Sequence, residues 1–204
     1  IRAGPLLFCR NGIKGLPVKW ANAADSSTTT KAKRWVRGCT GFPFHDACMR
    51  ELGATGWMSN RGRQNVASFL TKDLHLDWRI GAELFELLLI DYEVAANYGN
   101  WQYFSGVGMD PKERHFRTVS QGQIYDPQAT LIKSWLPELA KLPVAQAHEP
   151  WFITEKKATA RDEGKRVRTD DTEEEALQSM YCWLPMVDVQ TQKKYVACPS
   201  KSCV

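Results

Sequence analysis

The stretch AELFELLLIDYEVAANYGNW, residues 82–101, joins two very different kinds of sequence. Its first part, AELFELLLI (82–90), is apolar nearly all round and predicts a buried helix. Its second part, DYEVAANYGNW (91–101), places two acids, two asparagines and a tryptophan directly after that helix. A solvent-exposed loop needs neither the tryptophan nor so many hydrogen-bonding side chains, so we expect this junction to line a functional site.

The sequence around this stretch is predominantly helical in pattern. In FHDACMREL (44–52) apolar residues recur at helical spacing, which predicts an amphipathic helix. Further helices are predicted over residues 57–74, 77–90 and 129–142. Ser59 and Asp77 can cap two of them, and Pro137 interrupts the last. Since no segment alternates with a period of two residues, the predicted fold class is all-α, with helices 59–74 and 78–90 packed side by side.

Composition divides the chain into three parts. Residues 1–34 read as an irregular segment that contains the polar insert DSSTTT (25–30). Residues 35–152 form the predicted helical domain, within which 105–130 are rich in glycine, proline and aspartate and are expected to be irregular. Residues 153–204 read as a charged linker followed by a mildly apolar tail.

Bulk composition excludes several classes of protein. The 204 residues, 43% hydrophobic and 25% charged, suffice for one large domain or two small ones. A net charge of +4 favours an anionic partner without requiring one. The six cysteines and four histidines lack the spacing of a zinc site, so we predict no metal and reduced thiols. No apolar run is long enough to cross a membrane, and no membrane partner is expected. The first residue, Ile1, indicates a processed chain or a fragment.

The start of the second predicted helix carries several polar side chains. Asn60 and Arg63 lie three residues apart and share a face, while Arg61 and Gln64 lie on an adjacent stripe. Such residues often form only a solvated surface. Because VASFL (66–70) buries the helix immediately afterwards, we expect its polar end to line a cleft, beside Trp57.

Arg63 and Asp91 stand at the ends of neighbouring predicted helices, where they can form a buried bidentate ion pair. Asn60, Glu93, Asn97 and Trp101 would surround this pair. Such a cluster suits a planar, multiply hydrogen-bonding ligand such as the isoalloxazine ring of a flavin. A polar cluster with only a structural role explains the same residues, and the residue types alone do not separate the two readings.

Five motifs in order resemble the cryptochrome/photolyase family, over its C-terminal, helical, FAD-binding half. They are W-x-x-G-x-T-G-F-P (35–43), DACMREL-x-x-TG-W-M-S-N-R-x-R (46–63), ASFL-x-x-DL-x-x-DWR-x-G (67–81), L-x-D-Y-x-x-x-x-N-x-G-N-W (89–101) and WLPEL…HEPW (135–151). Within the family, NRGRQ (60–64) and NYGNWQY (97–103) resemble the DASH cryptochrome subclass. The resemblance implies a helical FAD-binding domain of the cryptochrome/photolyase type that is incomplete at its N-terminal side.

The resemblance also implies roles for individual residues. The residues implied to bind FAD are Asn60, Arg63, Asp91, Tyr92, Glu93, Asn97 and Trp57. Among them, Asn97 would face the flavin N5, and Asn60 would lie between FAD and the DNA lesion. Trp101, Trp78 and Trp20 would carry electrons from the flavin to the surface. Residues implied to meet DNA are Arg61, Gln64 and Tyr103, with Lys72 and Arg79 as further candidates for a basic rim.

Departures from the family pattern limit what is expected of this chain alone. Glu93 stands where the family has aspartate, which lengthens one hydrogen-bonding side chain by a methylene. The N-terminal antenna domain and the Thr/Ser-rich loop that holds the FAD diphosphate have no counterpart here. A methenyltetrahydrofolate-type antenna is therefore expected only together with that missing domain. The isolated chain is expected to be an inactive fragment with poor affinity for FAD.

The function that the resemblance implies is light-driven repair of cyclobutane pyrimidine dimers by a deoxyribodipyrimidine photo-lyase reaction. The expected partner is DNA that is single-stranded or carries a lesion, because such a base leaves the stack more readily. The protein is expected to be a monomer. A blue-light signalling cryptochrome without repair activity, and a truncated product that holds no FAD, are the alternatives. Chloroplast, mitochondrion, nucleus and cytoplasm all stay open as locations.

Overall fold

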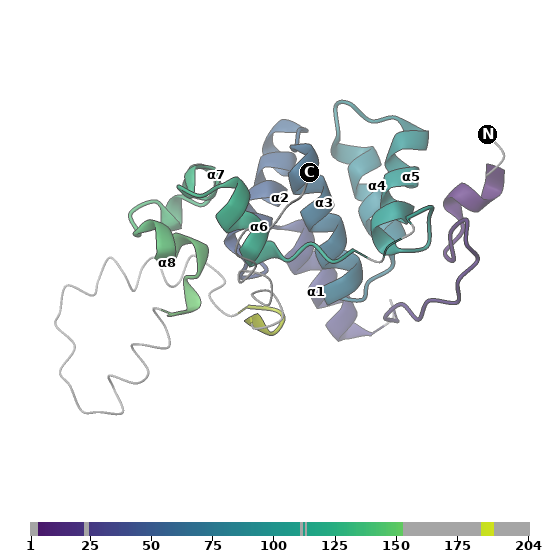
Figure 1. Ribbon diagram of the computed structural model, residues 1–204, viewed down its shortest axis with the longest axis horizontal. Helices are drawn as coiled ribbons and strands as arrows, with labels where there is room; N and C mark the ends of the chain where they lie inside the picture. The colour runs from purple at the N-terminus through teal and green to yellow at the C-terminus, as the bar shows by residue number, and fades with distance from the viewer. Residues whose placement is uncertain (1–3, 23–24, 111, 113, 153–184, 190–204) are drawn as a thin grey trace. The chain divides into compact units, whose positions relative to one another are not determined.

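A computed structural model describes residues 4–22, 25–110, 112, 114–152 and 185–189, and every regular element in this part of the chain is helical (Figure 1). The predicted all-α fold class is confirmed. The chain divides into two compact units. The first comprises Ile1–Gly38 with Cys48–Phe116, and the second comprises Cys39–Ala47 with Arg117–Val204.

Eight α-helices are found in the described residues, with shorter helical turns between them. Their bounds are α1 Ser26–Val36, α2 Pro43–Thr55, α3 Asn60–Ser68, α4 Trp78–Leu88, α5 Val94–Ser105, α6 Thr118–Tyr125, α7 Thr130–Trp135 and α8 Val144–His148. The shorter turns are two 3-10 helices, Gly4–Phe8 and Pro137–Leu139, and a π-helical turn, Phe69–Asp73.

The predicted caps of two helices are confirmed. The hydroxyl of Ser59 accepts a hydrogen bond from the Gly62 backbone N–H at 3.1 Å and begins α3. The carboxylate of Asp77 accepts from the Arg79 N–H at 3.1 Å and begins α4. Helix α3 runs on into the π-helical turn, so that the helical path ends at Asp73, close to its predicted end. Pro137 separates α7 from the following 3-10 helix, also as predicted.

Two segments predicted to be irregular are helical, so those predictions are wrong. The polar insert at residues 25–30 begins helix α1, since the Asp25 carboxylate accepts a hydrogen bond from the Ser27 N–H at 3.2 Å and caps it. Its serines and threonines are N-terminal helix residues rather than a loop. Helix α6 lies inside the segment 105–130. The expectation of reduced thiols is also wrong at Cys39, which is in a disulfide, whereas Cys9 and Cys48 are not disulfide-bonded. Spacing along the chain does not reveal which thiols a fold brings together.

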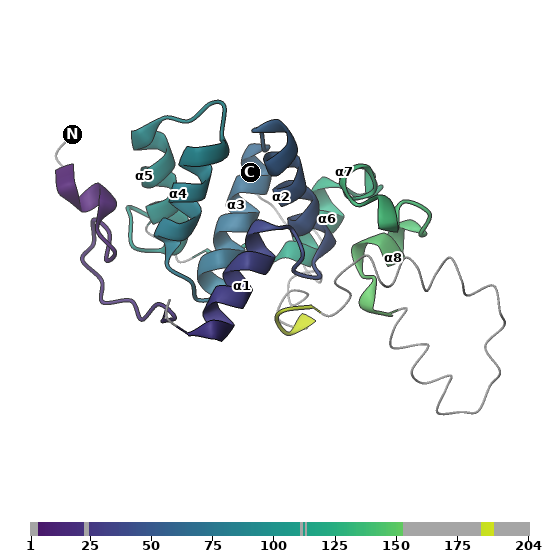
Figure 2. The ribbon, with the colours of Figure 1, turned by 180° about the vertical axis from the view of Figure 1, so that it is seen from behind.

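In the first unit, α4 and α5 form the most extensively packed pair of helices, and both views show them side by side (Figures 1 and 2). A Cβ added to Gly81 on α4 would lie only 2.0 Å from the indole of Trp101 on α5. One residue on, the Ala82 carbonyl accepts a hydrogen bond from the side-chain amide of Asn97 at 2.9 Å. The ring of Phe85 meets that of Trp101 edge-on, with the centroids 5.1 Å apart. Small residues on α4 thus allow α5 to approach and fix the position of Trp101.

In the second unit, buried carboxylates organise the turns. Asp46, fully buried, accepts hydrogen bonds from the Thr40 and Gly41 N–H groups at 2.9–3.0 Å and from the Thr40 hydroxyl at 2.6 Å. Burial opposes ionisation of Asp46, but hydrogen bonds from His45 and Thr40 outweigh it and lower its pKa. Asp126 accepts from the first backbone N–H groups of α7. In the described part of the tail, the Met186 N–H donates to the Thr40 carbonyl at 3.0 Å.

We predict that Gly81→Ala lowers the free energy of unfolding by about 1–3 kcal/mol, because the new methyl group overlaps the Trp101 indole. The matched control is Gly99→Ala on α5, where an added Cβ meets nothing within 4 Å. That change should leave stability unchanged or raise it by up to about 1 kcal/mol through helix propensity. Urea unfolding followed by circular dichroism measures both. Equal effects of the two substitutions would contradict the close contact at Gly81.

Candidate functional site

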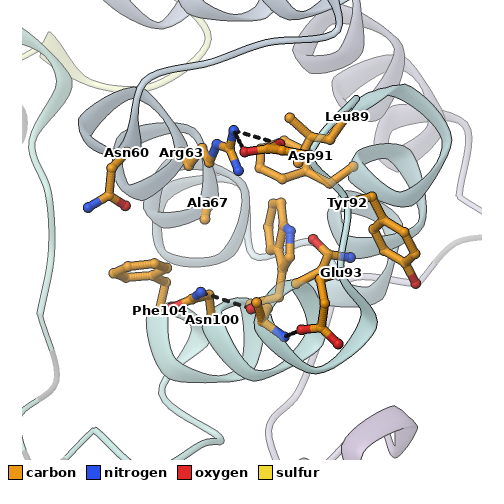
Figure 3. A pocket seen from close by; sticks show the side chains of 13 residues that line it. Asn60, Arg63, Ala67, Leu89, Asp91, Tyr92, Glu93, Asn100 and Phe104 are labelled. Atoms are coloured by element: carbon orange, nitrogen blue, oxygen red, sulfur yellow. Dashed lines mark hydrogen bonds and ion pairs between the residues drawn. The ribbon is translucent and has the colours of Figure 1, made fainter.

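The polar junction and the start of α3 meet at one pocket in the first unit (Figure 3). Helix α3 contributes Asn60, Arg63 and Ala67, and α4 with the following turn contributes Phe85, Leu89, Asp91, Tyr92 and Glu93. Helix α5 contributes Ala96, Asn97, Asn100, Trp101 and Phe104. The α3 and α5 residues each recur at helical spacing, so one face of each helix forms a wall.

Arg63 and Asp91 form the predicted ion pair. One guanidinium nitrogen, Nη2, donates to both carboxylate oxygens of Asp91, at 3.0 and 2.9 Å. The Nε of the same guanidinium donates to the Met58 carbonyl at 2.8 Å. The predictions of a buried pair and of a two-nitrogen fork are wrong, because the side chains are 26% and 52% exposed and a single nitrogen makes both contacts. Arg63 therefore joins the start of α3 to the turn after α4 at the rim of the pocket.

Glu93 is the N-cap of α5. Its two carboxylate oxygens accept hydrogen bonds from the backbone N–H groups of Ala95 and Ala96, at 3.0 and 2.6 Å. These hydrogen bonds stabilise the charged form and lower the pKa of Glu93 below its ordinary value. The side chain still lines the pocket. The longer glutamate, where the resembling family has aspartate, thus has a structural role in beginning the helix that carries Asn97 and Trp101.

The inner wall of the pocket is aromatic and the rim is polar. Trp101 is 2% exposed, and Asn97 is 7% exposed with its amide N–H committed to the Ala82 carbonyl. Asn100 instead donates to the Ala96 carbonyl at 2.8 Å. Figure 3 shows Tyr92 and Asn60 at opposite sides, with the hydroxyl of Tyr92 directed away from Ala67. A flat ring with a polar edge matches this combination of apolar wall and polar rim.

Several predicted site residues lie outside this pocket. Trp57, expected to contact the cofactor, is 46% exposed and is absent from the lining. Arg61 and Gln64 lie on the other stripe of α3, as their spacing predicted, and the Gln64 carbonyl oxygen is buried without a hydrogen-bond partner. Tyr103 packs edge-on against Phe104 at 5.3 Å, with the Arg114 guanidinium 5.7 Å from its ring centre. The structure therefore separates these residues from the Arg63–Asp91 pair.

The three tryptophans of the expected relay have different environments. Trp101 lines the pocket, and its ring contacts in the described residues are to Trp35, at 6.2 Å between centroids, and to Phe85. Trp78 is fully buried, contacts the Tyr98 ring at 6.1 Å and donates its N–H to the Arg10 carbonyl at 3.1 Å. Trp20, expected at the surface, is only 8% exposed. Among the tryptophans of the described residues, Trp35 is therefore the one in ring contact with Trp101.

Sequence reasoning missed the pocket residues Ala67, Phe85, Leu89, Ala96 and Phe104. Helical spacing could have found two of them, since Ala67 follows Asn60 and Arg63 on one face of α3, and Phe104 follows Asn97 on α5. Helix α5 was not predicted because asparagines and aromatic residues share its inner face. A mixed face of this kind hides the apolar stripe on which helix prediction depends.

Comparison with known proteins identifies the family. The family model described as the FAD binding domain of DNA photolyase matches residues 9–198. The chain belongs to this family. The cryptochrome DASH of Xenopus laevis is 58% identical over 155 residues, which are 76% of this chain and 29% of that protein. The chain thus spans less than a third of the length of this relative.

Solved structures of the photolyase family agree with the fold. The crystal structure of a Synechocystis cryptochrome matches with a TM-score of 0.75 and 41% identity, over 95% of this chain and 36% of that one. The archaeal photolyase of Sulfolobus tokodaii, crystallised with two FAD molecules, matches with a TM-score of 0.70 and 31% identity, over 95% and 39% of the two chains. The resemblance read from the five motifs is confirmed.

The described part of the chain shows neither a metal-ligand cluster nor a membrane-spanning helix. No group of three or more histidine, cysteine, aspartate or glutamate side chains there is arranged to hold a metal ion. None of the described helices has the length and apolar character required to cross a membrane.

The lowered pKa of Glu93 predicts a pH-dependent cap on α5. Its contribution is present above the ordinary glutamate pKa of 4.5 and is lost as the pH falls through the lowered value. In an NMR titration, the Ala95 and Ala96 amide shifts should report an apparent pKa below 4.5. Glu93→Gln should abolish this titration, and Glu83→Gln, an exposed change on α4, should not alter it. Ala96 shifts that titrate in Glu93→Gln as in the unchanged protein would contradict the cap.

Proposed function

We propose that this chain forms one wall of the flavin site of a cryptochrome DASH-type protein that repairs cyclobutane pyrimidine dimers in single-stranded DNA. The observation that carries the proposal is the meeting of Arg63, Asp91, Asn97 and Trp101 at one pocket. These residues come from helix α3, from the turn after α4 and from helix α5. Membership of the photolyase FAD-binding family supplies the ligand that such a wall would hold.

The residues present fit the isoalloxazine ring of FAD. Asn97 has its amide N–H tied to the Ala82 carbonyl, which fixes the side chain and leaves its amide oxygen to accept from a ligand. Asp91 and Tyr92 lie along the rim where a polar ring edge would lie, and Trp101 with Phe85 supplies an apolar surface. When bound, a reduced flavin supplies on excitation the electron that splits the dimer. The chain's part is to bind, orient and shield that ring.

Arg63 has a positioning role in this proposal. Its guanidinium is held on one side by the Met58 carbonyl and on the other by both oxygens of Asp91. A pair with this exposure contributes only about 0.2–1 kcal/mol to stability, so its effect on geometry is the larger one. Asp91 is thereby fixed at the pocket rim with its charge balanced.

We predict that the isolated chain binds FAD poorly. The pocket volume is about 70 Å³, well below the roughly 300–1,000 Å³ of sites that enclose a ligand of this size. The pocket residues would contact only the isoalloxazine ring of FAD. Much of the affinity for a dinucleotide comes instead from contacts to its diphosphate. Flavin fluorescence during titration with the purified chain should show a weak, unsaturated change. A chain that purifies yellow with one tightly held flavin per molecule would contradict this.

Repair of DNA requires groups beside the flavin pocket that meet the lesion. Asn60 stands at the open edge of the pocket and is exposed, consistent with contact to a flipped base. Arg61, Gln64 and Tyr103 are proposed to contact the nucleic acid outside the pocket, and Arg61, Lys72 and Arg79 to meet phosphates. The protein is proposed to act as a monomer. A methenyltetrahydrofolate-type antenna is proposed only for a protein that carries the additional domain.

The relay through Trp101 and Trp78 is tested in a chimera, in which this chain replaces the matching segment of the Xenopus laevis cryptochrome DASH. Trp78→Phe keeps a buried aromatic of similar shape, so packing changes little, but phenylalanine is much harder to oxidise. We expect FAD content to be unchanged and most blue-light photoreduction to be lost. Repair of dimers in single-stranded DNA by the chemically reduced protein should persist.

The matched control for the relay is Trp35→Phe. Trp35 is also fully buried and lies in ring contact with Trp101, but it donates its N–H to the Val66 carbonyl in the interior of the unit. We expect this variant to retain photoreduction. Loss in Trp35→Phe together with retention in Trp78→Phe would assign the outward path to Trp35 instead. Absence of repair by the reduced chimera that still holds FAD would contradict the proposed repair function.

A further inference from the structure

Tyr98 on α5 is a further oxidisable side chain beside the proposed tryptophan relay. It lies three residues before Trp101, so the two side chains share one face of the helix, one turn apart. Its ring also meets the Trp78 ring edge-on, with the centroids 6.1 Å apart and the planes at 84°. Tyr98 is therefore a neighbour of both indoles that carry charge in the proposed function.

The hydroxyl of Tyr98 has a proton acceptor in place. It donates a hydrogen bond to the Glu86 carboxylate on α4, with 2.8 Å between the phenolic oxygen and Oε2. Burial, followed by this hydrogen bond, raises the pKa of Tyr98, so that at neutral pH the side chain is a phenol with a proton to give. A carboxylate within hydrogen-bond reach of that proton can remove it when the ring is oxidised. Tyr98 is buried but Glu86 is exposed, so the carboxyl group can then release the proton to water.

Neither Trp78 nor Trp20 has an acceptor of this kind among the described residues. Trp78 is fully buried and donates its N–H to the Arg10 carbonyl at 3.1 Å. A backbone carbonyl accepts a hydrogen bond but does not take up the proton. The indole nitrogen of Trp20 is buried and has no hydrogen-bond partner in the described part of the chain. An oxidised indole at either position therefore keeps its proton and its positive charge, and it stays a strong oxidant.

Tyr92, in the turn after α4, approaches the same carboxylate. Partial burial, together with a hydrogen bond to Glu86, raises the pKa of Tyr92. Its hydroxyl points away from Ala67 in the pocket (Figure 3). Within the described residues its ring contacts neither Trp78 nor Trp101, whose ring contacts are to other side chains. Of the two tyrosines at Glu86, Tyr98 is therefore the one in contact with the relay.

We propose that Tyr98 is the terminal electron donor of the relay, that Trp78 passes its positive charge to Tyr98, and that Glu86 takes up the phenolic proton. This proposal rests on the proposed function, in which Trp101 and Trp78 carry electrons to the flavin. It places the end of the path at Tyr98 instead of Trp20. A tyrosyl radical that has lost its proton is neutral, so it attracts the transferred electron less than an indole radical cation does.

The step moves one electron and one proton. Its oxidant is the radical cation of Trp78, which forms when one electron moves through Trp101 to the light-excited, oxidised flavin. One electron passes from the Tyr98 ring to Trp78 and restores the neutral indole. The O–H bond of Tyr98 breaks, and its proton forms a new O–H bond at Oε2 of Glu86. The products are a neutral tyrosyl radical at Tyr98 and a neutral carboxylic acid at Glu86.

Electron paramagnetic resonance of the same Xenopus laevis chimera, frozen directly after a blue-light flash with oxidised FAD bound, tests the proposal. Tyrosine deuterated on its ring is incorporated, because deuteration narrows the spectrum of a tyrosyl radical and leaves that of a tryptophanyl radical unchanged. We expect a neutral tyrosyl radical in the unchanged chimera. In Tyr98→Phe, which keeps the ring and removes the hydroxyl, we expect a tryptophanyl radical instead.

Glu86→Gln tests the proton acceptor. The amide oxygen still accepts a hydrogen bond from Tyr98 but does not take up the proton. We expect the rate of tyrosyl formation, followed by transient absorption, to fall by about 100-fold, which is within the range for a positioned general base. The matched control is Glu83→Gln, since Glu83 is an exposed carboxylate on the same helix that acts on Tyr98 through its charge. This control should form the radical at the unchanged rate.

Tyr125→Phe is the control for the tyrosine, because Tyr125 is exposed on α6 in the second unit and should leave the radical unchanged. A tyrosyl radical that persists in Tyr98→Phe would overturn the proposal, as would one that is lost in Tyr92→Phe and kept in Tyr98→Phe. Equal rates in Glu86→Gln and Glu83→Gln would overturn the role of Glu86. Repair by the chemically reduced chimera does not use Tyr98, so its absence would contradict the proposed function alone.

Discussion

The close approach of α4 to α5 is the constraint on which the rest of the first unit depends. Gly81 has no side chain at the point where the Trp101 indole lies, and an added Cβ there would be 2.0 Å from the ring. Because the helices touch at this point, the Asn97 amide reaches the Ala82 carbonyl and the Phe85 ring packs on Trp101. The absence of a side chain at Gly81 therefore determines where the inner wall of the pocket at Trp101 lies.

The polar rim of the same pocket depends on connections between helix ends. Arg63 bonds to Met58 before α3 and to Asp91 after α4, and Glu93 caps α5 with both carboxylate oxygens. The Arg63 and Asp91 side chains are 26% and 52% exposed, so their ion pair contributes little to stability by itself. Their common effect is to fix three helix ends with respect to one another, which a site for a flat, polar-edged ligand requires.

The first unit thus contains two cavities of opposite chemical character. The pocket at Trp101 is small and aromatic inside, and its rim carries the Arg63–Asp91 pair and the carboxylate of Glu93. The second cavity, of about 610 Å³, is larger, and its described lining includes five cations together with Trp20.

Several helix starts and part of the pocket lining follow from the sequence alone. Helix caps and residue spacing are local signals, and they can be interpreted without knowledge of the fold. Ser59 and Asp77 mark helix starts by their capping chemistry, and the spacing of Asn60 and Arg63 places them on one face. The pairing of Arg63 with Asp91 follows from charges at adjacent helix ends. Helix α1 was missed because its serines and threonines favour turns as well as helix starts.

Tertiary structure alone decided which neighbours each side chain has. No spacing rule shows that Trp101 contacts Trp35 rather than Trp78, or that Trp57 does not line the pocket. The exposure of the Arg63–Asp91 pair and the gathering of five cations around Trp20 likewise depend on how segments distant in the sequence pack. The spacing of apolar residues indicates which face of a helix is buried. Contacts between helices depend instead on the shapes of the packed surfaces, such as the space left by Gly81.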